Sequence, residues 1–225
     1  QVHRASVRFR SGEGAIYSKN LLIALKGREL IRLQDFLVIG LYLGMAYFLD
    51  MGFFTFCSML MVWMFMLAST SSMVDDLSHH YVYLIPGGSV KKLFYTLAVP
   101  LGKNTVVMLI SLLGGGLLLG GDLEGIVAAA ILCLSFLLLF MAGNVVSLRL
   151  LRSRSNKMME QMLRALVTLL ALVPGLAVFI VVNVVIGDGA MRLAAPIFAA
   201  FNYLLALLIL FLCAPMMQGN EINAD

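Results

Sequence analysis

The stretch GIVAAAILCLSFLLLFMAGNVVSL, residues 125–148, decides the fold class of this chain. It contains no charged side chain and exceeds the length of about 20 helical residues that crosses the hydrocarbon core of a bilayer. Its apolar residues are continuous and do not alternate with polar ones, which favours a helix over a strand of a membrane barrel. The stretch therefore predicts a membrane-spanning α-helix.

The composition of the whole chain agrees with this prediction. Hydrophobic residues make up 61% of its 225 residues and charged residues 12%, whereas soluble domains average about 45–50% and about 25%. The mean hydropathy is +0.98. These values exclude a soluble enzyme, a disordered chain and a nucleic-acid-binding protein. We therefore expect an all-α, polytopic membrane protein.

Five further apolar runs predict a domain of six spans over residues 34–217. The expected spans are residues 34–50, 53–70, 104–120, 125–148, 165–186 and 193–216. In the preceding segment, 1–33, leucines alternate with charged residues from 16 onward, which predicts an amphipathic helix along the membrane face. A polar tail, 218–225, follows the spans. The chain begins with Gln1 and has no signal-peptide pattern, so we expect Gln1 to be a cut or an internal position.

The distribution of basic residues predicts the orientation. Fifteen of the sixteen lysines and arginines lie in the segment 1–33 or in the loops after the second and fourth spans. Lysine and arginine mark the cytoplasmic side of membrane proteins, so both termini are expected in the cytoplasm. Lys91, Lys92 and Lys103 lie in the loop at 73–103, and we expect them at the level of the lipid headgroups.

Few polar side chains fall inside the predicted spans. None is ionisable at mid-membrane, which argues against an ion-coupled secondary transporter. The strongest polar residues are Asn144, Asn183 and Asn202. Hydrogen bonds between helices are the first expectation for them, and pore lining is the second. Each cysteine lies in an apolar run, and we expect all three to be buried hydrophobic residues: Cys57, Cys133 and Cys213.

The loop at 73–103 is the most distinctive part of the sequence and has two interpretations. In the first, Asp75 with His79 and Asp76 with His80 share a helix face, at metal-ligand spacing. No further ligand stands at a supporting position, and the paired-histidine motif of zinc peptidases is absent. We therefore expect no metal site and no catalytic residue, but a metal-dependent, membrane-embedded lipid-processing enzyme stays open as an alternative.

In the second interpretation this loop is an amphipathic element that docks a protein at the cytoplasmic face. Its apolar and aromatic side chains would be the buried anchors of such a contact, and its charged ones would orient the partner. The candidate docking residues are Asp75, Asp76, Leu77, His79, His80, Tyr81, Tyr83, Leu84, Ile85 and Pro86.

Two segments resemble a known family. Tyr83-Leu84-Ile85-Pro86 followed by Val90-Lys91-Lys92-Leu93 is similar to the cytoplasmic loop between the second and third spans of bacterial ATP-binding-cassette (ABC) exporter permeases. Gly12-Glu13-Gly14-Ala15 with Lys19-Asn20-Leu21-Leu22 resembles the helix that precedes the first span in such permeases. Six spans with cytoplasmic termini are also the unit of that family.

The resemblance implies a function for this chain. It would be one half of a permease in a bacterial plasma membrane, without a cofactor of its own. The sequence has no G-x-x-x-x-G-K-[ST] phosphate loop, so ATP and Mg²⁺ would bind to a separate ATPase subunit that docks on the loop at 73–103 as a coupling helix. Closure of two ATPase subunits would rock the spans between inward-open and outward-open states. The second six-span half would be another copy, a different protein or an upstream part of the same chain.

The loop between the fourth and fifth spans is a second candidate contact. Met158, Met159 and Met162 fall on one helical face there. An equally weighted interpretation is a basic helix that lies on anionic lipid.

The expected activity is therefore ATP-driven export of a peptide or an amphipathic molecule. The outer loops are too short to receive cargo from an external binding protein, which disfavours an importer. Besides the metal-dependent enzyme and the ion-coupled transporter, a membrane scaffold that transports nothing stays open.

Overall fold

A computed structural model describes residues 11–26, 33–69, 72–78, 81–150, 157–186 and 191–218. Their regular structure is entirely helical, which confirms the predicted all-α class. In chain order the helices are α1 (Gly14–Lys26), α2 (Leu33–Phe48), α3 (Gly52–Ser69), α4 (Ser72–Ser78), α5 (Tyr81–Leu84), α6 (Ser89–Leu118), α7 (Leu123–Leu150), α8 (Lys157–Ile186), α9 (Met191–Cys213) and the 3₁₀ helix η2 (Ala214–Gln218).

Four helical segments are long and apolar enough to cross a membrane: Gly52–Ser69, Ser89–Leu118, Leu123–Leu150 and Ala195–Gln218. Leu33–Phe48 and Ala165–Gly175 are apolar but shorter. The described chain is thus a multi-pass helical protein, and the six-span count stays a prediction.

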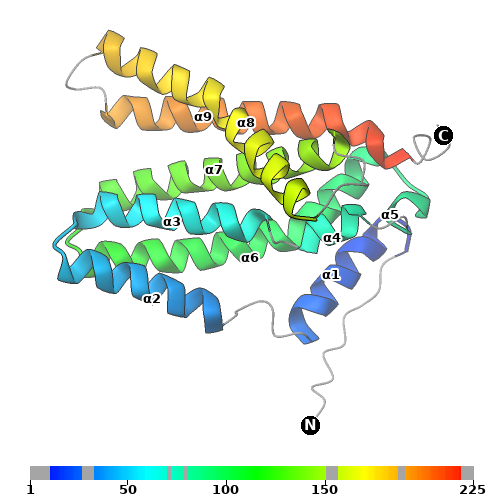
Figure 1. The fold of residues 1–225 in the computed structure, drawn as a ribbon, viewed down its shortest axis with the longest axis horizontal. Coiled ribbons are helices and arrows are strands. Elements are labelled where there is room, and N and C mark those ends of the chain that lie inside the picture. The colour runs from blue at the N-terminus through cyan, green and yellow to red at the C-terminus, as the bar shows by residue number, and fades with distance from the viewer. Residues whose placement is uncertain are drawn as a thin grey trace.

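The long helices form a bundle with two different ends (Figure 1). The turns from α2 to α3 and from α6 to α7 lie together at one end, which we call the turn end. Helices α1, α4 and α5 and the 3₁₀ helix η2 lie at the other, which we call the loop end. Helix α7 packs against α3, α6, α8 and α9 and forms the centre of the bundle. Its small residues permit this close packing: a side chain added at Gly143 would collide with Thr168 of α8.

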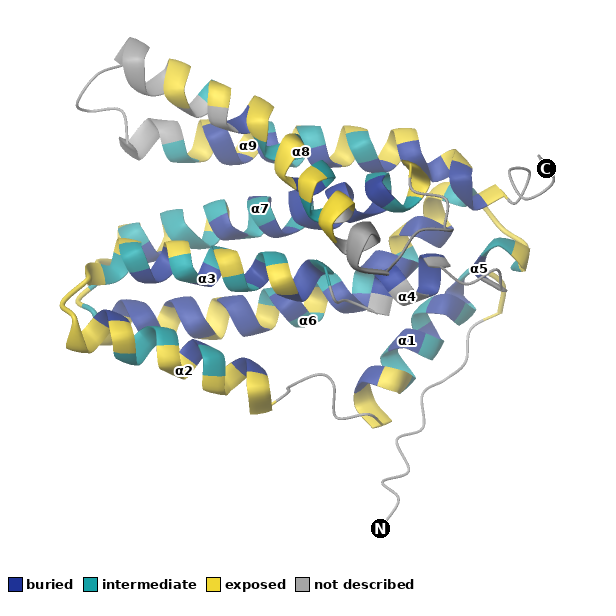
Figure 2. Cartoon of the chain, viewed as in Figure 1, coloured by how far each residue is buried: buried dark blue, intermediate teal, exposed yellow. Residues whose placement is uncertain are grey.

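The buried side chains form two clusters, and Figure 2 shows where the buried residues lie along the helices. One joins α2, α3, α6 and α7 and includes Phe56 and Leu60. The other lies toward the loop end and includes Met73, Val82 and Met217 beside residues of α6, α7 and α9. The described residues of the segment between α3 and α6 thus contribute to the hydrophobic core.

Helix α6 begins at Ser89, about fifteen residues before the expected third span. Residues 89–103, which the sequence assigns to the connection between the second and third spans, are thus helical and continuous with the expected third span. No glycine or proline interrupts the chain from Ser89 to Val99, and α1, α4 and η2 pack against α6. Pro100 lies inside the helix, where membrane helices tolerate proline because neighbouring groups satisfy the freed backbone.

Candidate functional site

The loop end has an inner and an outer face. Met73, Val74 and Leu77 of α4 and Val82 of α5 are buried in the core. Leu84, at the end of α5, is 77% exposed, and Pro86 and Gly87 beside it are exposed as well. In the segment formed by α4 and α5, the buried apolar side chains thus hold the segment against the core. The Leu84 side chain at its end is exposed.

An ion pair fastens α4 to α1. The Lys19 ammonium lies 2.7 Å from Oδ1 of Asp76, and the Asn20 side-chain amide donates a 2.5 Å hydrogen bond to Oδ2. The Asp76 carboxylate is buried, so these charge-assisted contacts offset its loss of water. Asp76 therefore serves to attach the loop to α1.

Tyr83 folds α5 back onto α4. Its hydroxyl donates a 2.7 Å hydrogen bond to the backbone carbonyl of Leu77. This carbonyl lies in the last turn of α4, where helix carbonyls lack a partner within the helix. Tyr83 thus closes the end of α4 and fixes the angle between the two short helices.

Glu13 connects the start of α1 to the bend before α6. Its Oε1 accepts a 3.2 Å hydrogen bond from the backbone amide of Gly88. This bond, the backbone amide of Glu13 itself and the nearby Lys91 and Lys92 ammonium groups lower the pKa of the Glu13 carboxyl below its ordinary value. Glu13 is therefore charged at neutral pH and complements the basic start of α6.

Lys92 lies inside the loop end. Its side chain is almost entirely buried, and its ammonium donates 3.2 Å hydrogen bonds to the backbone carbonyls of Tyr83 and Met217. Its side chain is therefore enclosed by the chain itself, and its expected position at the level of the lipid headgroups stays a prediction. Lys91, next to it in the sequence, is exposed.

Lys103 is also inside the bundle and not at its surface. Its ammonium lies 3.8 Å from Oδ2 of Asp35 on α2, and the two side chains are 14% and 3% exposed. Sequence reasoning missed this pair. The only indication in the sequence is that Asp35 stands at the start of the short apolar run 36–49. Nothing in the local sequence connects Asp35 to Lys103 on another helix.

The predicted docking residues separate by burial. Asp76 and Leu77 are buried, Tyr83 and Ile85 are half-buried, and Leu84 and Pro86 are exposed. The expectation that Asp76 and Leu77 face a partner is not met in this structure, because their side chains pack within the chain. His79 and His80, and the side chains of Asp75 and Tyr81, lie outside the described residues. Among the residues described, no three of His, Cys, Asp or Glu are placed to hold a metal ion.

The other candidates lie away from the loop end or outside the described part. Met162 on α8 is 65% exposed, and the side chains of Met158, Met159 and Asn183 are not described. Asn144 and Asn202 are fully buried, yet their amide groups make no hydrogen bond in the described structure. The expected hydrogen bonds between helices are therefore not observed at these two positions.

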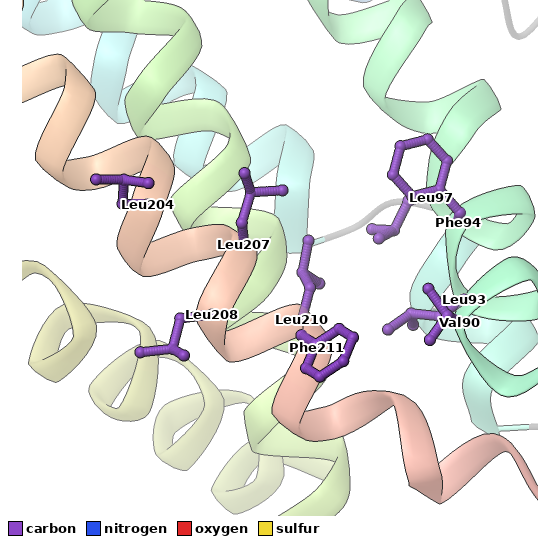
Figure 3. A pocket seen from close by; sticks show the side chains of 9 residues that line it. All are labelled: Val90, Leu93, Phe94, Leu97, Leu204, Leu207, Leu208, Leu210 and Phe211. Carbon is purple, nitrogen blue, oxygen red and sulfur yellow. The ribbon is translucent and has the colours of Figure 1, made fainter.

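An apolar groove of about 450 Å³ separates the start of α6 from the end of α9 (Figure 3). Side chains from both helices line it: Val90, Leu93, Phe94, Leu97, Leu204, Leu207, Leu208, Leu210 and Phe211. Beyond this groove, η2 packs against α6 and α5.

Comparison with known proteins identifies a family. A family model described as "Putative ABC exporter" matches residues 1–221, which is nearly the whole chain and includes all of the loop end. No curated protein and no solved structure matched the sequence.

Proposed function

Because the chain belongs to the ABC exporter family, we propose that it is the permease half of an ATP-driven exporter and that a separate ATPase subunit docks on its loop end. Family membership makes the chain a membrane component of a transporter. The proposal adds the ATP coupling, the docking surface and the cargo, a peptide or an amphipathic molecule that leaves through a bacterial plasma membrane.

The observation that carries the proposal is the exposure of Leu84 on a segment that is otherwise tightly held. The Asp76–Lys19 ion pair, the Tyr83–Leu77 hydrogen bond and the buried apolar residues of α4 make this segment part of the core. Transmission of a rigid-body movement requires a firmly held element, and a protein interface requires apolar anchors that a partner can bury. The large exposed side chain of Leu84, on this firmly held segment, provides such an anchor.

The proposed division of labour places ATP and Mg²⁺ on the partner. The sequence contains no phosphate-loop motif, whereas ABC transport needs two nucleotide sites. A second six-span half would complete the transport pathway. The metal-dependent enzyme and the ion-coupled transporter, both considered from the sequence, are not favoured by the family.

The test is co-purification of the ATPase with a Leu84→Asp variant. Leu123, at the start of α7, provides a matched control because it is also 77% exposed but lies at the turn end. Membranes are solubilised in mild detergent, the tagged chain is captured, and bound ATPase is quantified by mass spectrometry. We expect the wild type and Leu123→Asp to retain the ATPase, and Leu84→Asp to lose roughly 90% of it, as the loss of a central apolar anchor predicts.

Two results would overturn the proposal. One is a wild-type chain that retains no ATPase, and the other is equal retention by Leu84→Asp and Leu123→Asp. Size-exclusion profiles of the variants check that the bundle is intact.

Met162→Asp tests the second candidate contact in the same experiment. Loss of the ATPase in both Leu84→Asp and Met162→Asp would mean that the partner contacts α8 as well as the loop end. Loss in Leu84→Asp alone would leave Met162 facing lipid or the second half.

A further inference from the structure

Lys92 is a buried cation that none of the proposed docking contacts uses. Its side chain is 3% exposed. Two backbone carbonyls accept hydrogen bonds from its ammonium, Tyr83 at the end of α5 and Met217 at the end of η2. The second acceptor lies 125 residues away in the sequence. Lys92 thus brings together three elements: α5, its own helix α6, and η2.

The chemistry of these contacts explains why a lysine can be buried here. An ammonium group has three N–H donors and no acceptor, and removing it from water is costly unless those donors are bonded. Carbonyls in the last turn of a helix lack a partner within the helix. Tyr83 and Met217 both stand in such a turn, and the Glu13 carboxylate lies close enough to interact electrostatically with Lys92.

The bond to Tyr83 stiffens the joint between α5 and α6. The two helices are separated by the bend at residues 85–88, which contains Pro86, Gly87 and Gly88. Two consecutive glycines make this bend easy to deform. Lys92 reaches back across it to Tyr83, so α5 and the start of α6 are held by a polar contact as well as by the chain.

The bond to Met217 connects the same joint to α9. Helix η2 follows α9 directly, with no residue between them, and Met216 and Met217 are buried in the cluster that also contains Val82 and Leu93. Toward the middle of the bundle, the apolar groove separates α6 from α9 (Figure 3). A movement of the loop end can therefore be transmitted to α9 through the polar and apolar contacts of η2. Helix α9 in turn packs along the central helix α7.

We propose that Lys92 is the positioning residue that joins the ATPase-docking segment, formed by α4 and α5, to α9 through η2, so that one displacement of this segment moves α6 and α9 together. This inference rests on the proposed function, because the displacement is supplied by the docked ATPase. It assigns to the C-terminal end of the transmembrane domain a part in coupling that the docking surface alone does not require.

The test compares Lys92→Met with Lys91→Met. Methionine has an unbranched, apolar chain but no donor, and Lys91 is the exposed neighbour that carries the same charge change. Amide hydrogen exchange is measured first on the purified chain without ATPase. We expect Lys92→Met to raise exchange in the peptides that cover α5 and η2 by roughly tenfold, because local opening loses these bonds. Lys91→Met should leave exchange unchanged, and Lys92→Arg, which keeps charge and donors, should restore most of the protection.

A second measurement uses the complex captured with its ATPase. Exchange is recorded with and without Mg-ATP and vanadate. In the wild type we expect the nucleotide to change exchange in both α6 and α9. In Lys92→Met the amount of bound ATPase and the response of α6 should persist, while the response of α9 should be lost.

The proposal is overturned if Lys92→Met matches Lys91→Met in the first measurement, or if α9 still responds to nucleotide in the second. Should Lys92→Met fail to fold, deletion of residues 215–225 removes the Met217 acceptor and leaves Lys92 in place. This deletion is expected to abolish the α9 response, and a retained response contradicts the proposal. Failure of the proposed function is separate: a wild-type chain without ATPase overturns that function, while the first measurement still decides whether Lys92 joins α5 to η2.

Discussion

At the scale of single residues, the buried charges described here have defined partners on other helices. Asp76 meets Lys19 of α1, and Asp35 of α2 meets Lys103 of α6. Lys92 meets backbone carbonyls. Removing a charge from water costs several kcal/mol unless a partner offsets it, so each pairing also constrains how two helices can lie. These few polar contacts thus specify positions that apolar packing alone would leave less defined.

The Asp35–Lys103 pair allows this cost to be measured. Lys103→Met leaves the Asp35 carboxylate buried without this cation, and we expect it to lower the free energy of unfolding by about 3 kcal/mol. Replacing both residues, Asp35→Leu with Lys103→Met, should recover most of that loss because no unpaired charge remains. Denaturant titrations in detergent micelles provide the measurement.

The exposed Lys91→Met is the control, and its effect should stay within about 0.5 kcal/mol. A double variant that loses as much as the two single variants combined would show that the pair is not a coupled unit.

At the scale of elements, the bend between α5 and α6 decides how α5 is oriented relative to α6. Pro86 has no amide hydrogen to continue a helix. Gly87 has φ +149°, a conformation that favours glycine. Gly88 is extended, with φ −73° and ψ 132°, and its amide is free to bond Glu13. The three residues end one helix, turn the chain and start the next.

Gly87→Ala should therefore be far more damaging than Gly88→Ala. A side chain at Gly87 would be strained and would collide with Glu13, whereas one at Gly88 would approach Glu13 only to 4.0 Å. We expect Gly87→Ala to lower the free energy of unfolding by about 1–3 kcal/mol, the usual cost of a disfavoured backbone conformation. Thermal unfolding of the two variants in detergent measures the difference, and equal effects would contradict this account of the bend.

The dependence of stability on pH, measured by thermal unfolding at several pH values, gives a second test with the Gly87→Ala variant. The folded pKa of Glu13 is lowered from 4.5, chiefly by its bond to Gly88. Its contribution to stability is thus fully present above pH 4.5 and is lost as the pH falls through the lowered value. In Gly87→Ala the Glu13 carboxyl is displaced from Gly88, so its pKa should lie nearer the ordinary value. The loss of stability on acidification should therefore be smaller in this variant than in the wild type.

At the scale of the whole molecule, the bundle has one end with short turns and one end with short helices and basic residues. Lys19, Lys91 and Lys92 all lie at the loop end. The preference of basic residues for the cytoplasmic side predicts that this end lies in the cytoplasm, where an ATPase subunit would meet it. The orientation is the prediction on which the docking proposal depends.

Cysteine labelling in intact cells tests that orientation. The three native cysteines are free and buried, so the wild type should not react with a membrane-impermeant maleimide. Leu123→Cys at the turn end should react in intact cells, and Gln218→Cys at the loop end should react only after lysis. The reverse pattern would place the loop end outside the cell and remove the docking proposal.

The sequence by itself determined the membrane class, the helical fold and the approximate limits of the segments Gly52–Ser69 and Leu123–Leu150. These properties depend on the length and continuity of apolar runs, which are local. The sequence also pointed to Leu84 and Pro86 through a short motif. It did not reveal that Asp76 and Leu77, in the same motif region, are buried.

Only the tertiary structure decided the rest. Helix α6 extends to Ser89 because other elements pack against residues that look like a loop in isolation. The partners of Asp76, Asp35 and Lys92 come from distant segments, and no periodicity in a sequence records which buried charge meets which. Burial cost makes such pairs necessary, but three-dimensional packing selects them, and that selection makes the loop end one connected unit.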